Sequence, residues 1–141
     1  MIRFIRQHPD EKFSGIHISR AWLDEVVTRY GWLTGSIDFV FCDDQFLLGM
    51  NQSFLDHNDL TDIITFDNHE VSGYISGEIY ISLDRVYENA IELAIDFEYE
   101  LNRVVVHGVL HLIGYSDKTE DEKMAMRHEE DLCLSLLYTS H

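Results

Sequence analysis

The sequence predicts an α/β (α+β) fold with a single domain, residues 1–141, in which a mixed four-stranded sheet is packed with about five helices. Two observations lead to this prediction. Segments with the alternating pattern of strands take turns along the chain with segments whose apolar residues recur at helical spacing. The 141 residues are 45% hydrophobic and no Pro-rich or Gly/Ser-rich linker divides them, so one core is expected.

The N-terminal half is expected to contain strands at residues 15–18 and 36–42, each followed by a helix. Ser19 is the predicted N-cap of the first helix, because a serine oxygen there can accept from a free backbone N–H. Asp43 or Asp44 would cap the second helix in the same way. The apolar faces of the two helices would consist of Trp22, Leu23, Val26, Val27 and Tyr30, and of Phe46, Leu47, Met50 and Phe54.

The C-terminal half is expected to add strands at residues 60–66 and 77–82, followed by three helices. The first of these helices would cover residues 83–94, and the second would begin near Phe97. The segment 119–122, Thr-Glu-Asp-Glu, matches a capping box and predicts the start of the last helix. The side chains of that helix expected to pack inward are Met126, Leu132, Cys133, Leu136 and Leu137.

Composition limits where the protein works and what it contacts. The N-terminus lacks the apolar core of a signal peptide and no apolar run is long enough to cross a bilayer, so we expect a cytoplasmic protein with no membrane partner. Cys42 and Cys133 are expected to be reduced core residues. The net charge of −16 should repel a phosphate backbone, so binding of nucleic acid would depend on a local group of basic residues.

The most informative segment runs from His107 to Asp117 (His-Gly-Val-Leu-His-Leu-Ile-Gly-Tyr-Ser-Asp). His107 and His111 are four residues apart, so on a helix they project from one face. Gly114 is the expected helix stop, and Asp117 follows it closely enough to act as a third ligand. Two histidines and one carboxylate leave a coordination position open, which is typical of a catalytic metal site. The alternative interpretation is that the two histidines bind no metal and donate hydrogen bonds to backbone carbonyl groups.

Glu100 and Arg103 extend the histidine pair into one polar stripe on an otherwise apolar helix. Arg103 could therefore contact a phosphate, or it could form an ion pair with Glu100 or another carboxylate. His128 on the last helix is an alternative third ligand. The remaining candidates, His57, His69 and His141, are interpreted as surface histidines.

Three blocks of the sequence resemble the YbeY family of bacterial metal-dependent endoribonucleases and rRNA maturation factors. Residues 107–117 are similar to the family pattern His-Gly-x-Leu-His-Leu-x-Gly-Tyr-Asp-His. Residues 51–66 resemble the block that ends in Pro-Thr-Asp-Val-Leu-Ser-Phe, and residues 77–82 resemble the strand Gly-Asp-Ile-x-Ile-Ser. The resemblance implies hydrolysis of RNA in 16S rRNA maturation and ribosome quality control, with rRNA and the small ribosomal subunit or its associated proteins as partners.

Two positions depart from the family pattern. Asp117 replaces the third histidine ligand; an aspartate can also bind zinc, but its negative charge lowers the Lewis acidity of the ion. Leu55 stands where the family has an arginine thought to act on RNA. Unless Arg103 or Arg85 takes over that role, RNA cleavage is expected to be weaker or differently arranged.

The expected enzyme is a zinc-dependent endoribonuclease with one Zn²⁺ per chain, held by His107, His111 and Asp117. Gly108 follows the first histidine, so the glutamate base of the His-Glu-x-x-His proteases is missing. Arg103 and Glu78 are the predicted catalytic residues, and Asp62 is another possible base. For both Glu78 and Asp62, the favoured interpretation is a strand-end carboxylate that makes a turn or a cap.

Two other functions remain open. The protein could be a ribosome-assembly factor whose metal is structural or vestigial, which the charge of −16 and the missing arginine favour. It could also be a zinc-dependent hydrolase of another substrate.

Overall fold

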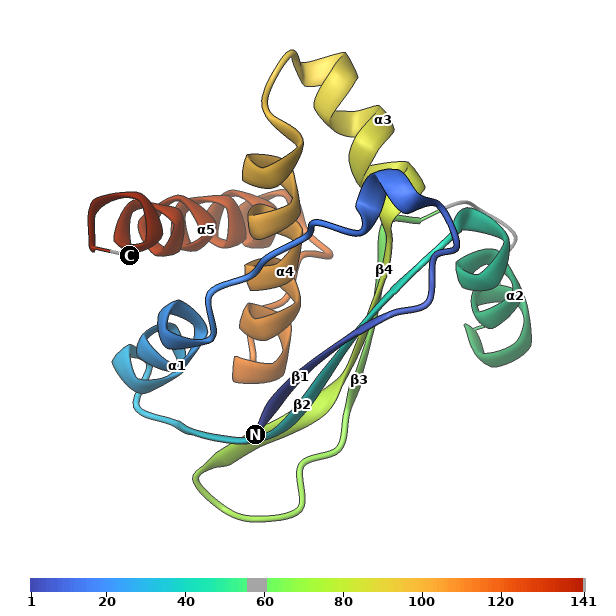
Figure 1. Cartoon of the computed structure of the whole chain (residues 1–141). Coiled ribbons are helices and arrows are strands. Elements are labelled where there is room, and N and C mark those ends of the chain that lie inside the picture. The colour runs from blue at the N-terminus through green and yellow to red at the C-terminus, as the bar shows by residue number, and fades with distance from the viewer. Residues whose placement is uncertain (56–60, 141) are drawn as a thin grey trace.

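A computed structural model describes residues 1–55 and 61–140 of the chain, and it contains one four-stranded sheet and five α-helices (Figure 1). The strands are β1 (Ile2–Arg6), β2 (Leu33–Cys42), β3 (Ile63–Asp67) and β4 (Tyr74–Ser82). The helices are α1 (Arg20–Arg29), α2 (Asp44–Leu55), α3 (Leu83–Leu93), α4 (Phe97–Ile113) and α5 (Glu120–Ser140), with a short 3₁₀ turn at Glu11–Phe13. The predicted α/β class is confirmed.

The sheet is mixed, as predicted, with strand order β1-β2-β4-β3. β1, β2 and β4 run parallel, while β3 is antiparallel to β4. Apolar residues such as Phe39, Ile75 and Ile79 alternate with polar ones along β2 and β4, so that one face of the sheet is the core face. No helix in the described part of the chain is long and apolar enough to span a membrane.

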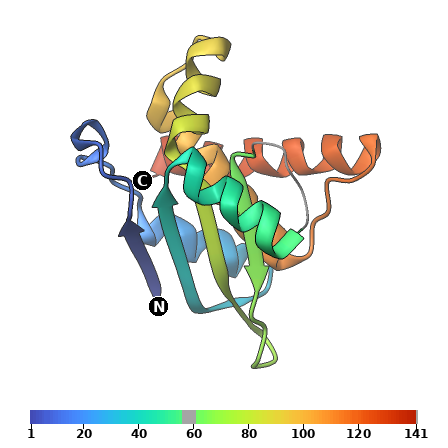
Figure 2. The same cartoon turned by 90° about the vertical axis from the view of Figure 1, so that its right-hand side faces the viewer.

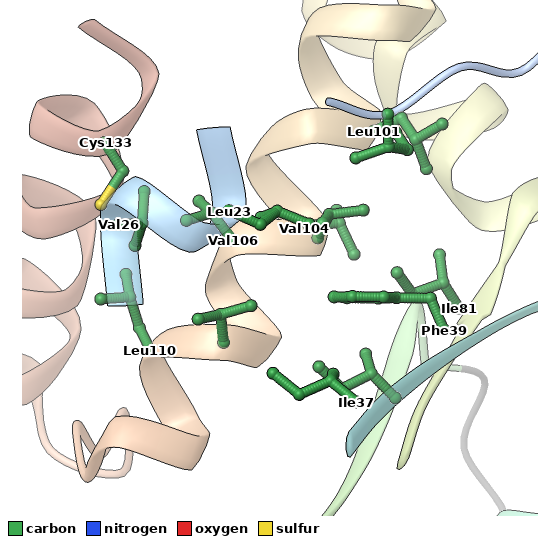
Figure 3. Packing of buried hydrophobic residues seen from close by; sticks show 14 of the residues in the cluster. Leu23, Val26, Ile37, Phe39, Ile81, Leu101, Val104, Val106, Leu110 and Cys133 are labelled. Atoms are coloured by element: carbon green, nitrogen blue, oxygen red, sulfur yellow. The ribbon is translucent and has the colours of Figure 1, made fainter. Parts of the chain in front are cut away.

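The helices lie on both faces of the sheet, as Figures 1 and 2 show. α1 and α4 pack on the core face, α5 packs against α4 and α1, and α2 packs against β3 and β4 from the other side. α4 is central: its side chains Leu101, Val104, Val106 and Leu110 are buried between α1, α5 and the strands (Figure 3). The polar residues of α4 are therefore held on a rigid, fully packed support.

A glycine lets α4 approach the sheet beside the first histidine. A Cβ atom at Gly108 would lie 2.9 Å from Ile79 Cγ2 and 3.0 Å from Ile63 Cδ1. Those distances leave no room for a larger residue. Gly108 thus sets the distance between the helix that carries His107 and the strands β3 and β4.

Most predicted helix caps are present. Ser19 Oγ accepts from the N–H of Trp22 at 3.1 Å, and Asp43 Oδ1 accepts from Phe46 at 2.8 Å. Thr119 and Glu122 form the reciprocal capping box, with distances of 2.9 and 3.1 Å. These local bonds satisfy backbone donors that a helix start leaves free.

Two predictions are wrong. Residues 15–18 do not form a strand; they lead into α1, and Ile18 is buried there by packing, which produced the strand-like pattern. The first strand is instead β1, whose Ile2 points into the core. On α5, Leu132 is 50% exposed and Leu134 is buried instead, because the buried face follows the three- and four-residue spacing of Met126, Glu130, Cys133 and Leu134, and Leu132 lies off that face.

Candidate metal centre

The structure brings the side chains of His107, His111 and Asp117 together at the C-terminal end of α4. Their candidate ligand atoms all lie within 4.8 Å of one another. The two Nε2 atoms are 2.9 Å apart, and Asp117 Oδ2 lies 3.2 Å from His107 Nε2 and 3.4 Å from His111 Nε2. Three donors at these separations match ligands around one ion with bonds of about 2.0–2.2 Å.

Local chain geometry explains how the third donor reaches the histidine pair. Gly114 has a φ of 125°, a conformation that favours glycine, and its N–H bonds to the carbonyl groups of Leu110 and His111. The N–H of Tyr115 bonds to Leu110 as well, at 3.0 Å. This ending reverses the chain, so that the loop between α4 and α5 returns Asp117 to the histidine face.

The remaining ring nitrogens are held by fixed acceptors. His107 Nδ1 lies 2.6 Å from Glu130 Oε2, and His111 Nδ1 lies 2.9 Å from the Tyr115 carbonyl oxygen. A carbonyl oxygen can only accept, so Nδ1 of His111 must carry the proton. In the neutral ring of His111 the lone pair then remains at Nε2, which lies beside His107 Nε2 and Asp117 Oδ2. Two imidazole nitrogens and a carboxylate oxygen this close together are a donor set that fits a metal ion.

Arg103 is enclosed by two carboxylates of α5. Its guanidinium donates to Glu130 Oε1 at 2.9 Å and to Asp131 Oδ1 at 2.8 Å, and its side chain is only 9% exposed. Burial disfavours the charged guanidinium, but the hydrogen bonds to Asp131 and Glu130 outweigh it and raise the pKa of Arg103. The ion-pair interpretation of Arg103 therefore fits, with Glu130 and Asp131 as partners in place of Glu100.

His107 is similarly balanced between burial and charge. Burial favours the neutral imidazole, but the hydrogen bond to Glu130 and the nearby carboxylates outweigh it and raise the pKa of His107. The carboxylates that act on the ring are Glu130, Asp117 and Asp62. In the metal-free protein the surrounding carboxylates favour a second proton on the His107 ring, and a bound cation would take the place of that proton.

A cleft of about 710 Å³ opens beside the metal centre, between β3, α4 and α5. Acidic and basic side chains both line it: besides the three ligands, these include Asp62, Asp67, Glu100, Arg103, Arg127 and Glu130. Arg127 is exposed and forms no salt bridge within the described ranges. The cleft therefore has an exposed cation at its rim, whose charge acts on Glu100, and carboxylates in its interior.

Two carboxyl groups in this cleft have perturbed acidity. Burial raises the pKa of Asp62, against the opposing effect of His107. Burial also raises the pKa of Glu100, whose Oε1 atom is buried and has no hydrogen-bond partner. Both groups hold a proton more readily than an exposed acid, which is a common property of residues in active sites.

Glu78 is not brought to the metal centre. It lies on β4 next to Gly77, whose missing side chain would point toward Leu112 of α4. Because neighbours along a strand point to opposite faces, Glu78 projects from the other face of the sheet, where it accepts from Tyr80 Oη at 2.9 Å and lines a different hollow. A base for this cleft is therefore better sought in Asp62.

The other candidates also lie away from the cluster. Arg85 on α3 is paired with Asp44 at 3.1 Å. His128 is exposed on α5 and is not among the grouped ligand atoms, and His69 stacks edge-on against Trp32. The predictions for the side chain of Leu55 and for His57 and His141 fall outside the described residues.

Glu130 is the important residue of the site that the sequence analysis missed. It is 5% exposed and lies on the buried stripe of α5, between Met126 and Cys133. The sequence does contain a signal for it: Glu130 lies at helical spacing among residues expected to be buried. A buried carboxylate needs a partner, so this spacing could have indicated that Glu130 contacts a polar group of the site.

The chain is similar to known proteins over most of its length. A family model described as "Endoribonuclease YbeY" matches residues 8–138. Proteins of that name include one from Cytophaga hutchinsonii, 50% identical over 83% of this chain and 82% of its own length, and one from Karelsulcia muelleri, 39% identical over 97% and 96%. The solution structure of TM1509 from Thermotoga maritima aligns with a TM-score of 0.64 at 27% identity, covering 96% of this chain and 87% of its own.

Proposed function

The chain belongs to the YbeY family of endoribonucleases, and we propose that it uses one zinc ion, held by His107, His111 and Asp117, to hydrolyse RNA phosphodiesters. The proposal extends to its biological role, which would be 16S rRNA maturation and ribosome quality control in the cytoplasm. Its partners would be precursor rRNA and the small ribosomal subunit or proteins associated with it.

One observation carries the proposal: three donor atoms of different residues lie within 4.8 Å of one another at the edge of a cleft. The chemistry that a bound zinc ion supplies is polarisation of a phosphoryl oxygen and a lowered pKa for a water molecule. The nitrogen and carboxylate donors suit zinc, and they also suit iron or manganese.

Asp62 is the carboxylate best placed to act as the general base. It lines the same cleft as the three ligands, and burial raises its pKa toward the working pH. A base with a pKa near the working pH is the most effective one for proton transfer. The Asp62 carboxylate would accept a proton from the attacking water, and Glu78 would not take part.

Arg127 is the cation best placed to bind an RNA phosphate. Arg103 and Arg85, the two arginines considered for this role, are both engaged by carboxylates. Arg127 lines the cleft, is exposed and, within the described residues, has no salt-bridge partner. It would supply the positive charge that Leu55 does not provide, although from α5 rather than from the end of α2.

The second candidate, a ribosome-assembly factor with a structural or vestigial metal, is favoured by the charge balance. The net charge is −16, and the cleft contains more carboxylates than free cations. Such a protein would bind the metal and the ribosomal subunit without turnover of RNA.

Cleavage of precursor 16S rRNA by purified protein separates these functions. The protein is first stripped with a chelator, and cleavage is then measured with and without added zinc. We expect zinc to restore cleavage in the wild type and not in His111→Ala, whereas His128→Ala, which changes an exposed histidine of α5, should behave as wild type. Equal cleavage by His111→Ala would reject the metal mechanism. A His111→Ala protein that restores rRNA processing in cells lacking the wild type would support the assembly factor.

A further inference from the structure

Glu130 stands between two hydrogen-bond donors in the buried space under the metal centre. Its Oε1 atom accepts from Arg103 Nη1 at 2.9 Å, and its Oε2 atom lies 2.6 Å from His107 Nδ1. Its side chain is 7% exposed, so water does not compete for either oxygen. Only a group with two acceptors fits both neighbours when the Nδ1 atom of His107 carries the proton.

We infer that Glu130 is a positioning residue of the metal centre, which keeps the proton of His107 on Nδ1 and so keeps the Nε2 lone pair directed at the ion. This inference rests on the proposed metal site. It means that α5 contributes a residue to the metal centre, although none of the three candidate ligands lies on α5.

Arg103 keeps the carboxylate of Glu130 in place. The guanidinium is a donor only, and it bridges Glu130 and Asp131 on consecutive positions of α5. Arg103 and His107 are one turn apart on α4, so the carboxylate of Glu130 on α5 can contact both side chains. The two contacts link α4 to α5. Arg103 therefore acts on the carboxylate and leaves phosphate binding to another residue.

A Glu130→Gln variant tests the role of the two oxygens with almost no change in shape. Glutamine offers one acceptor and one N–H₂ donor. Its oxygen must face Arg103, because Arg103 cannot accept, and so the N–H₂ group must face His107 Nδ1. His107 would then accept at Nδ1 and carry its proton on Nε2, the atom that points to the ion. A proton there blocks ligation.

The tautomer of His107 can be read directly from the ¹⁵N shifts of its ring nitrogens. The measurement uses metal-free protein at a pH above the pKa values of both site histidines, so it does not depend on activity or on a bound ion. We expect the proton on Nδ1 in the wild type and on Nε2 in Glu130→Gln. Asp131→Asn is the matched control, since it removes the other carboxylate partner of Arg103 but leaves the contact with His107; it should keep the wild-type tautomer.

Zinc affinity, measured by competition with a chelator, gives the second readout. Loss of an outer partner of a ligating histidine weakens metal binding by about 10- to 100-fold. We expect a loss of that size in Glu130→Gln and little change in Asp131→Asn. The inference is overturned if neutral His107 carries its proton on Nε2 in the wild type, which needs no variant to fold, or if Glu130→Gln keeps Nδ1 protonated. If His107 changes tautomer as expected but none of the proteins binds zinc, Glu130 still positions the ring and the proposed metal function fails instead.

Discussion

The Nε2 atoms of His107 and His111 lie 2.9 Å apart. The Nδ1 atom of His107 contacts the Glu130 carboxylate, and the Nδ1 atom of His111 contacts the Tyr115 carbonyl oxygen. The pair is therefore arranged to share one positive species between its inner nitrogens. Asp117 adds a carboxylate oxygen at 3.2 and 3.4 Å from the same atoms. The arrangement favours a cation at this end of α4.

Asp117→His should increase the rate of RNA cleavage at saturating zinc. The change replaces a negative ligand by a neutral one, so the bound ion polarises a phosphoryl oxygen more strongly. It also restores the histidine that the resemblance to the family places at this position. Single-turnover cleavage with the zinc content of each protein checked beforehand measures the effect. A lower rate in a variant that is fully loaded with zinc would count against this view of Asp117.

Arg127→Ala should weaken RNA binding and make it less dependent on salt. A lysine or arginine that neutralises one phosphate contributes about one unit to the slope of log affinity against log salt concentration. Titration of a non-cleavable RNA over a range of salt concentrations gives that slope. Lys123→Ala is the control, because Lys123 is an exposed cation one turn earlier on α5, close to Glu120. Equal losses in the two variants would indicate a diffuse charge effect.

Asp62→Asn should lower the rate constant for cleavage by about 10²- to 10⁴-fold, the usual contribution of a general base. Burial raises the pKa of Asp62, so the wild-type rate should fall as the pH drops through that raised value. The variant should lack this acid limb. Asp67→Asn, at an exposed carboxylate of the same cleft, should keep the acid limb and most of the rate. An unchanged pH profile in Asp62→Asn would assign the base to another group.

Glu100→Gln should stabilise the metal-free protein at neutral pH by about 1 kcal/mol, because burial of a carboxylate whose Oε1 atom has no hydrogen-bond partner outweighs its attraction to Arg103 and Arg127. Burial raises the pKa of Glu100 above its ordinary value of 4.5 in the folded state. The folded state therefore binds the proton more tightly, and wild-type stability falls as the pH rises from 4.5 through the raised pKa.

Urea unfolding at several pH values measures this difference. The advantage of Glu100→Gln should be largest at neutral pH and should vanish below pH 4.5, where both states of the wild type are protonated. Glu98→Gln, at an exposed position two residues earlier on α4, should change the stability little at any pH. A Glu100→Gln protein that is less stable than wild type at neutral pH would show that the carboxylate has a partner.

Sequence patterns predicted most of the elements because each relevant signal is local. The cap at Ser19, the capping box at Thr119 and Glu122, and the stop at Gly114 all depend on residues within one turn of each other. The same holds for the spacing of His107 and His111. The first strand was misplaced because Ile18 is buried by packing of the loop before α1, and a short apolar segment does not distinguish such packing from a strand.

The parts of the site that depend on distant segments were not predictable in this way. Glu130 reaches His107 from another helix, and no local pattern specifies that α5 lies against α4 at this register. The predicted base Glu78 lies away from the cleft for a related reason. Its strand was predicted, but which face of the strand met α4 depends on the close approach at Gly77 and Gly108.

Metal content measured together with RNA cleavage tests the central claim most directly. Protein purified without added metal is analysed for its elements, and the same sample is assayed on precursor 16S rRNA. We expect about one zinc per chain in the wild type, with cleavage, and the loss of both in His111→Ala. Cleavage that persists in a His111→Ala protein containing no metal would contradict the account.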